Sequence, residues 1–300
     1  MRCGNRGLTV PSLIVLALAA SAFFAFAGVA GSAPPGPLGP PQRDNDHGHW
    51  FAHTCAQPPH GFAACGAQVV TNAYGSPLSG TSAPVGAYGP AQFHGAYNLP
   101  TTAATPKTIA IVDAYDDPSI ASDLTAYDSA YGLPDLAAYP SSSPWFRKVN
   151  QTGGTSYPKG DTGWGLEIAL DVETAHEICQ NCNVLLVEAS SNSFDDLGAA
   201  ENEAAALGAN VISNSWGGGD FSGESYYDSY FNHGIVITAS TGDSGYGVEY
   251  PASSQDVIGV GGTTLNVTAS NGYGSESAWS GAGSGCSGSE PKPSWQKDTG

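Results

Sequence analysis

Positive charge is scarce in this 300-residue sequence, which holds 9 Lys and Arg residues against 27 Asp and Glu residues. Nucleic-acid binding depends on clustered Lys and Arg that neutralise phosphates, so nucleic acid is excluded as a partner. The formal net charge of −18 makes the protein repel itself at neutral pH. Protonation of carboxylates relieves this repulsion, so the composition favours an acidic working pH. An acidic surface that serves only solubility is the alternative.

Long apolar runs are absent after the N-terminal region, which excludes a later membrane span. At the N-terminus, Arg2 and Arg6 precede an apolar run from Leu8 to Ala30 and then small residues up to Ala33. This order is typical of a secretory signal peptide over residues 1–33, with an uncleaved membrane anchor as the alternative. We therefore expect a secreted monomer that does not contact the membrane once the signal is removed.

Cysteine is also sparse, with six residues in the chain. Cys55 and Cys65 are close enough to form a small loop, and Cys179 and Cys182 form a C-x-x-C pair. In an exported protein this pair indicates a structural disulfide rather than a redox centre. A zinc site would need a second pair of ligands, so we assign no metal-binding residue. Cys286 is left unpaired, and we expect its partner beyond residue 300.

The distribution of Pro and Gly divides the remaining chain into two regions. Residues 34–88 are interpreted as a Pro/Gly-rich linker followed by a short pro-segment or N-terminal extension. In residues 89–300, apolar runs alternate with helical patterns. The predicted strands are Lys107–Ala114, Val184–Ala189, Val211–Trp216, Ile235–Ser240 and Val257–Val260, and the predicted helices are Gly163–Ile178, Asp195–Leu207 and Tyr226–Asn232. This alternation predicts an α/β fold with a mainly parallel sheet, whose site lies at the carboxyl ends of the strands.

Two acidic residues stand four positions apart in the predicted helix Gly163–Ile178. Glu167 and Asp171 would lie one turn apart on the same face, among apolar neighbours. Two carboxylates on a buried face should share a proton, which suits general-base chemistry in acid. The alternative is a solvent-facing carboxylate paired with a distant cation. Glu173 and Glu177 repeat the spacing, and we interpret them as surface residues.

Two further motifs follow predicted strands. Asp243 comes directly after Ile235–Ser240, where its protonated carboxyl could donate a hydrogen bond to an oxyanion. A turn Asp that bonds its own backbone is the alternative. In V-I-S-N-S-W-G-G-G, Gly217 and Gly218 leave the backbone open, so that an extended peptide could pair with it. An ordinary strand end is the alternative there.

Four motifs together resemble those of the sedolisin family of serine-carboxyl peptidases: E-I-A-L-D-V-E, I-S-N-S-W-G, A-S-T-G-D-S-G and E-Y-P-A-S-S-Q-D-V-I-G-V-G-G-T-T. They occur in the family's order, and the likeness runs from about Tyr88 onward. The resemblance implies a subtilisin-like fold and endopeptidase action on proteins or peptides at acidic pH, in a peptidase S53-like domain over residues 89–300. It implies that Glu167 is the general base, Asp171 its orienting partner and Asp243 the oxyanion donor. The implied substrate-binding residues are Ser213, Ser215, Trp216, Gly217 and Gly218.

The chain also departs from the family's pattern. The family's nucleophilic serine lies in a late S-G-T-S motif, which does not follow the other motifs here. We therefore expect an incomplete domain whose nucleophile lies beyond residue 300. An S-G-T-S does occur at Ser79–Ser82, but it precedes the first predicted strand of the sheet, so its order is wrong. The resemblance also implies calcium, with ligands expected beyond residue 300.

Three alternatives to this interpretation remain. A true subtilisin would use an acid such as Asp113 with a histidine base, but none of the seven histidines lies in a matching motif. We interpret His176 as a structural cap at the end of its helix. The missing nucleophile allows a non-catalytic binding or inhibitory relative. A secreted adhesin-type module fits the 14 Tyr and 6 Trp, but it leaves the carboxylate motifs unexplained.

Overall fold

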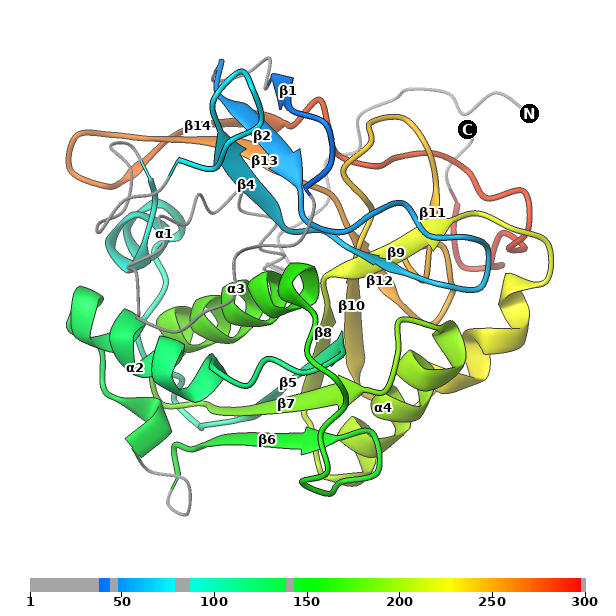
Figure 1. The fold of residues 1–300 in the computed structure, drawn as a ribbon, viewed down its shortest axis with the longest axis horizontal. Helices are drawn as coiled ribbons and strands as arrows, with labels where there is room; N and C mark the ends of the chain where they lie inside the picture. Colours follow the sequence, from blue (N-terminus) through cyan, green and yellow to red (C-terminus); the bar gives the residue numbers. More distant parts are fainter. Residues whose placement is uncertain (1–37, 44–47, 79–86, 139–142, 298–300) are drawn as a thin grey trace.

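The fold is built on a six-stranded parallel sheet in the order β12-β10-β8-β5-β7-β6 (Figure 1). The structure is a computed structural model that describes residues 38–43, 48–78, 87–138 and 143–297. The strands are β5 (Thr108–Ala114), β6 (Phe146–Asn150), β7 (Asn183–Ala189), β8 (Val211–Asn214), β10 (Val236–Ser240) and β12 (Ile258–Val260). All five pairings are parallel. The predicted α/β class is confirmed.

The central strands are buried on both faces, as their continuous apolar runs predicted. Val112 in β5 belongs to a cluster that includes Leu197 of α4 (Phe194–Ala206). The neighbouring residue Ile111 belongs to a second cluster, with Ile168 of α3 (Thr162–Ile178) and Leu124 of α2 (Ile120–Tyr131). Because successive side chains of a strand point to opposite faces, helices cover both sides of the sheet.

The start of α3 is fixed by a side-chain cap and by a close backbone approach. Asp161 accepts hydrogen bonds from the backbone N–H groups of Gly163 and Trp164. A Cβ atom at Gly163 would lie 2.5 Å from the carbonyl oxygen of Thr54, so only glycine allows the N-terminal region to approach the helix here. These constraints place the first two turns of α3 against residues 54–68.

The smaller sheets lie beside the main one. They are β1 (Gln42–Arg43) with β2 (Trp50–His53) and β4 (Gln68–Thr71), then β3 (Ala64–Cys65) with β9 (Trp216–Gly219) and β11 (Glu249–Tyr250), and last β13 (Thr263–Val267) with β14 (Tyr273–Ala278). The remaining elements are α1 (Pro90–Tyr97) and the 3-10 helices η1 (Leu136–Ala138) and η2 (Glu224–Tyr230). Strands β2 and β4 lie on the side of α3 away from the parallel sheet (Figure 1).

Several sequence expectations need correction. The strand predicted over Val211–Trp216 divides at Ser215 into β8 and β9, and the predicted helix over Tyr226–Asn232 is the 3-10 helix η2. Strand β6 and helix α2 were not predicted. Glu173 and Glu177 are 5% and 1% exposed, so their interpretation as surface residues is wrong. Helix α2 packs on this part of α3 and covers both side chains.

Two predicted cysteine pairs are confirmed as disulfides, Cys55–Cys65 and Cys179–Cys182. Cys286 is also disulfide-bonded, so the expectation that it is unpaired in this chain is wrong. Its partner lies outside the described residues. The predicted signal peptide and Ser82 also fall outside them. No helix in the described part of the chain is long and apolar enough to span a bilayer.

Candidate active site

The predicted carboxylate pair lies near the carboxyl ends of the central strands. Glu167 is 2% exposed and accepts a hydrogen bond from the backbone N–H of Ala67. One turn further along α3, Asp171 accepts a hydrogen bond of 2.7 Å from the Ser215 hydroxyl. Ser215 occupies the break between β8 and β9, so the end of a central strand reaches the helix here. Both acids therefore point to the sheet edge where parallel sheets place their sites.

Asp243 reaches the same point from a different element. It follows β10 and accepts a 3.1 Å hydrogen bond from Gln68 Nε2. A Cβ atom at Gly66 would lie 3.5 Å from Asp243 Oδ2 and 3.7 Å from Glu167 Oε2. The two carboxyl groups thus converge on the space beside Gly66 that a larger side chain would fill. The structure brings together Glu167, Asp171 and Asp243, the three residues assigned to catalysis.

Burial raises the pKa of each of these acids. The pKa of Glu167 lies well above its usual range because of burial and, next, the charge of Asp171. Burial raises the pKa of Asp171 to about 7, although the hydrogen bond from Ser215 acts in the opposite direction. Burial raises the pKa of Asp243 to about 6, and the hydrogen bond from Gln68 opposes this. The three acids are therefore able to hold protons in mild acid, where free carboxyls are ionised.

A fourth acid, Asp113, lies behind the pair. It is fully buried at the end of β5, and neither of its carboxyl oxygens has a hydrogen-bond partner among the described residues. Burial raises its pKa strongly, and the charges of Asp171 and Glu167 add to the effect. The prediction that Asp113 lies at the end of a strand is correct, but the sequence analysis treated it only as the acid that a true subtilisin would use. Asp113 therefore belongs with Glu167 and Asp171 to one buried group of acids, and its raised pKa favours its neutral form.

His176 is remote from this chemistry. It is fully buried near the end of α3, with its Nε2 atom 2.9 Å from the carbonyl oxygen of Pro134 and 3.3 Å from Asp128 Oδ1. These contacts tie α3 to the segment after α2. The interpretation of His176 as a structural residue agrees with this position.

The predicted substrate-binding residues divide into two groups. Trp216, Gly217 and Gly218 form β9, and the indole of Trp216 donates a 2.7 Å hydrogen bond to the carbonyl oxygen of Val112. Ser213 lies earlier, inside the parallel sheet in β8. Strand β9 is already paired on both edges, with β3 on one side and β11 on the other. The strand predicted to receive a peptide is thus occupied by residues of this same chain.

Sequence reasoning missed the groups that the N-terminal region brings to the site, namely the Ala67 N–H and the Gln68 amide. They come from residues about 100 and 175 positions away from their partners, and no local pattern signals such contacts. It also missed Glu249 in β11. A Cβ atom at Gly217 would lie 2.6 Å from Glu249 Oε2. Burial, then the charge of Asp243, raises the pKa of Glu249 to about 7.

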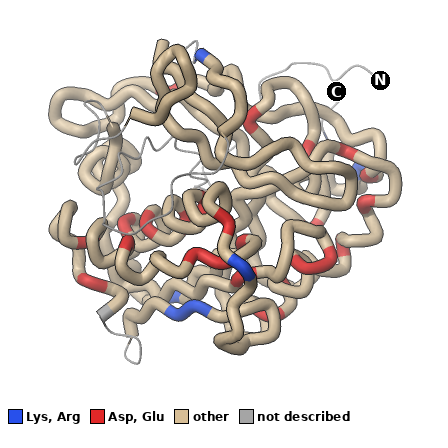
Figure 2. The backbone as a smooth tube through the Cα atoms, in the orientation of Figure 1, with Lys and Arg blue, Asp and Glu red and all other residues tan. Residues whose placement is uncertain are grey.

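The charged side chains of the candidate site are carboxylic acids. Among the described residues, no group of three or more His, Cys, Asp or Glu side chains is arranged to hold a metal ion. Figure 2 shows acidic positions along α3 and sparse basic positions elsewhere. The acids thus have few cations nearby to hold them ionised.

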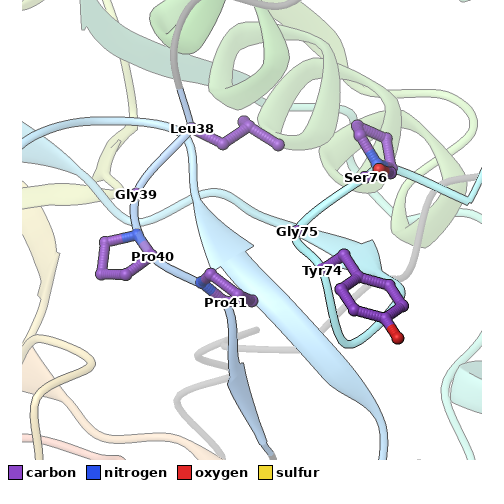
Figure 3. Close-up of a pocket in the computed structure, with 8 residues that line it drawn as sticks. Leu38, Gly39, Pro40, Pro41, Tyr74, Gly75 and Ser76 are labelled. Atoms are coloured by element: carbon purple, nitrogen blue, oxygen red, sulfur yellow. The ribbon is translucent and has the colours of Figure 1, made fainter.

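A separate surface pocket carries no comparable chemistry. It is lined by two turns rich in Pro and Gly, Leu38–Pro41 and Tyr74–Pro77 (Figure 3). None of its lining residues is an acid, a histidine or a lysine. It shares no residue with the carboxylate cluster, so the cluster is the candidate site.

Comparison with known proteins gives a consistent picture. The profile of the Subtilase family matches residues 166–295. Kumamolisin from Bacillus sp. (strain MN-32) is 28% identical over 241 residues, which cover 70% of this chain and 41% of kumamolisin. Sedolisin from Pseudomonas sp. (strain 101) is 37% identical over a shorter stretch, 21% of this chain and 15% of sedolisin.

Among solved structures, Pseudomonas sedolisin, a serine-carboxyl proteinase complexed with two molecules of pseudo-iodotyrostatin, superposes with a TM-score of 0.55 and 26% identity. The match covers 70% of this chain and 65% of that structure. The chain thus spans about two fifths of kumamolisin's length and less than two thirds of the sedolisin structure. The predicted subtilisin-like architecture is confirmed.

Proposed function

Because this chain belongs to the sedolisin family, we propose that the protein is a secreted serine-type endopeptidase that hydrolyses proteins or peptides at acidic pH. The observation that carries the proposal is that Glu167 and Asp243 both converge on the extended backbone at Gly66, directly after the strand β3 that pairs with β9. This is the arrangement that acyl transfer needs: a proton acceptor and an oxyanion donor facing one peptide bond.

In the proposed reaction, a serine hydroxyl attacks the carbonyl carbon of the scissile bond while Glu167 accepts the hydroxyl proton. Asp171, held by Ser215, orients Glu167 and shares its charge. Asp243 is protonated and donates a hydrogen bond to the oxyanion. Glu167 then gives its proton to the leaving nitrogen, and water hydrolyses the acyl-enzyme by the same route in reverse.

The attacking serine is proposed to lie C-terminal to residue 300 in the complete enzyme. Two observations support this position. The curated relatives are considerably longer than this chain. Among the described residues, the Glu167 carboxyl accepts hydrogen bonds from the backbone of Gly66 and Ala67 rather than from a serine hydroxyl. We propose the calcium site for the same C-terminal part.

The acidic working pH follows from the protonation that Asp243 requires. Only the neutral acid can donate to an oxyanion, and the pKa of Asp243 is about 6. Activity should therefore be present below this pKa and should fall as the pH rises through it. Secretion is supported by the signal-peptide pattern and by the disulfides Cys55–Cys65 and Cys179–Cys182. We propose that the secreted protein acts as a monomer.

Casein hydrolysis by the complete enzyme, measured across the pH range, tests the proposal. We expect more cleavage at pH 4 than at pH 8, and little cleavage by the matched variant Glu167→Gln at either pH. Greater activity at pH 8 would refute the acid assignment, and an unchanged Glu167→Gln variant would refute the base assignment. Absence of cleavage by the complete enzyme at every pH would favour the alternative of a non-catalytic, sedolisin-like binding or inhibitory protein.

A further inference from the structure

Lys148 in β6 differs in burial from the other basic residues that the structure describes. Its side chain is 11% exposed. The remaining Lys and Arg residues of the described ranges are all exposed, namely Arg43, Lys107, Arg147, Lys159, Lys292 and Lys297. Lysine is rarely buried unless it is paired, so its position here calls for an explanation. We propose that Lys148 is a positioning residue of the active site, whose ammonium group favours the ionised form of the base Glu167. The inference rests on the proposed function.

The Lys148 ammonium lies between the loop after β5 and strand β7. Its Nζ atom donates a 2.5 Å hydrogen bond to Asp116 Oδ1 and a 2.9 Å hydrogen bond to the carbonyl oxygen of Asp117. It also lies 3.4 Å from Glu188 Oε1. Three oxygen atoms from two neighbouring elements therefore surround the ammonium and fix its place.

Tyr157 covers the ammonium on a further side. The Nζ atom of Lys148 lies 4.1 Å from the centroid of the Tyr157 ring, and the Tyr157 hydroxyl donates a 3.1 Å hydrogen bond to the carbonyl oxygen of Lys148. An aromatic face attracts a cation and takes the place of water beside it. The charge of Lys148 is therefore screened less than that of an exposed lysine and acts over a longer distance.

Glu188 connects the ammonium to the buried acids. Glu188 is fully buried, and in the parallel pairing of β5 with β7 it is the partner of Asp113. Paired residues of neighbouring strands point to the same face of a sheet, so Asp113 lies one strand away from a carboxyl that Lys148 contacts. The charges of Asp171, Glu167 and Glu188 all act on Asp113. The ammonium thus lies beside the same group of acids as the base.

A second connection runs through the loop after β5. The loop is held by Lys148 at the carbonyl oxygen of Asp117. A Cβ atom at Gly165 would lie 3.7 Å from the Asp117 carboxyl carbon, so this loop lies against the first turn of α3. Gly165 is two residues before Glu167. Lys148 therefore also supports the helical turn that carries the base.

A cation is needed here because the base must be ionised in acid. Burial, then the charge of Asp171, raises the pKa of Glu167 well above its usual range, and a protonated Glu167 cannot accept the serine proton. A nearby positive charge favours the ionised form of a carboxyl. Glu188 shows this effect directly: burial raises its pKa to about 8, and the charge of Lys148 is the largest influence that opposes burial.

The other titratable groups around Lys148 are acids of neighbouring elements. Asp116 and Asp117 belong to the loop after β5. Burial raises the pKa of Asp117, the charge of Asp123 in α2 adds to this, and Lys148 opposes it. Glu173 of α3 follows behind Asp117, whose charge acts on it. These acids compete for the single ammonium, so its removal should raise the proton affinity of the whole group.

Asp243 lies outside this influence. The pKa of Asp243 is raised by burial and lowered by the hydrogen bond from Gln68, and Lys148 is not among its causes. Lys148 should therefore act on the proposed base and not on the proposed oxyanion donor. The acid limb of the pH profile reports the ionisation of the base, whereas the alkaline limb reports the loss of the Asp243 proton.

The pH dependence of kcat/KM for casein hydrolysis by the complete enzyme tests the inference. Lys148→Met keeps an apolar stem but removes the charge, so the acid limb should move to higher pH by about half a unit to one unit, while the alkaline limb stays in place. Lys148→Arg keeps the charge and should restore the acid limb of the wild type. A loss of kcat/KM at every pH with no movement of the acid limb would overturn the inference.

Arg147→Met is the matched control, because it removes one positive charge from the adjacent, exposed position of β6. It should leave both limbs in place. An equal shift in Arg147→Met and Lys148→Met would show that net charge rather than the position of Lys148 is responsible, and it would overturn the inference.

A titration of Glu167 separates this inference from the proposed function. The pKa of Glu167 can be followed by carbon-13 NMR of its carboxyl, with the signal identified by its loss in Glu167→Gln. It should be higher in Lys148→Met than in the wild type, and an unchanged value would overturn the inference. Absence of casein cleavage at every pH would count against the proposed function, and the titration would still decide the role of Lys148.

Asp116→Asn keeps the test decisive if Lys148→Met does not fold. It removes the carboxylate that pairs with the ammonium but keeps the shape of the side chain. The positive charge is then less compensated, so the pKa of Glu167 and the acid limb should both move to lower pH. No movement, or movement to higher pH, would contradict the inference.

Discussion

The two halves of helix α3 carry acidic pairs of the same spacing but of different environment. Glu167 and Asp171 lie in the first half, and Glu173 and Glu177 in the second. Burial raises the pKa of all four. The spacing of the acids and the direction of their pKa shifts therefore do not distinguish the candidate catalytic pair from the second pair.

The difference lies in what covers each half. In the second half, the Tyr127 hydroxyl of α2 donates a 2.5 Å hydrogen bond to Glu177, and Glu173 lies close to Asp123 and Asp128 of the same helix. The first half meets an extended backbone instead, at Ala67. A helix covers its neighbour permanently, whereas an extended segment can be replaced by another peptide. The comparison teaches that the covering element, rather than the acids, distinguishes a site from a core.

The largest effect is expected for a substitution of Glu167, which tests the comparison of the two pairs directly. Glu167→Gln should lower kcat/KM of the complete enzyme by about 10²–10⁴-fold, the usual contribution of a positioned proton-transfer group. The matched control is Glu173→Gln, which lies in the second half of α3, buried near Asp123 and Asp128 of α2, and it should leave kcat/KM nearly unchanged. Casein or peptide hydrolysis near pH 4 measures both. Equal losses in the two variants would show that the halves do not differ in function.

The next effect concerns Asp243, the acid that follows β10. Asp243→Ala removes the proposed oxyanion donor and should reduce kcat by about 10²–10³-fold. Asp243→Asn donates a hydrogen bond whatever the pH, so it should retain more activity than the Ala variant. Because Asp243 with a pKa of about 6 loses its proton as the pH rises, the Asn variant should also keep its activity to higher pH. An identical alkaline limb in the Asn variant and the wild type would rule out this role.

The sequence predicted the burial of Glu167 and Asp171 correctly but not that of Glu173 and Glu177, for a physical reason. Glu167 and Asp171 lie in a helix whose apolar periodicity is visible in the sequence. Burial of Glu173 and Glu177 depends on contacts with α2, which lies about 50 positions earlier in the chain and was not predicted. Strand β6 was missed because Arg147 and Lys148 interrupt its apolar pattern at the edge of the sheet.

The position of the segment around Gly66 beside the carboxylates was the other feature that the sequence did not predict. The turn-rich segment around Gly66 has no strong strand pattern, and β3 contains only two residues. Its position is set by contacts with Ser215 and Glu167, each at least 100 residues away. Local patterns place elements along the chain, but they do not indicate which element lies in a groove formed by others.

The third effect concerns the free energy of unfolding and a residue of the second half of α3, Glu177. Burial raises the folded-state pKa of Glu177 to about 7, so the folded state binds this proton more tightly than the unfolded state. The resulting stabilisation is present below the unfolded pKa and is lost as the pH rises through about 7. Glu177→Gln should therefore reduce the fall in unfolding free energy between pH 5 and pH 8, by on the order of 2–3 kcal/mol. Denaturant unfolding at both pH values measures it, and an unchanged fall would contradict the assignment.

The smallest expected effect concerns the pKa of Asp171, which can be changed without removing an acid. The Ser215 hydroxyl donates to Asp171 and so favours its ionised form, which keeps the pKa of Asp171 lower than burial alone would make it. Ser215→Ala should raise the proton affinity of Asp171 by roughly a factor of ten or less. The pH dependence of kcat/KM should then shift to higher pH, while Ser222→Ala, an exposed serine, should leave it in place. A lower kcat/KM with no shift would mean that Ser215 only supports β9, and that the Asp171 proton takes no part in the reaction.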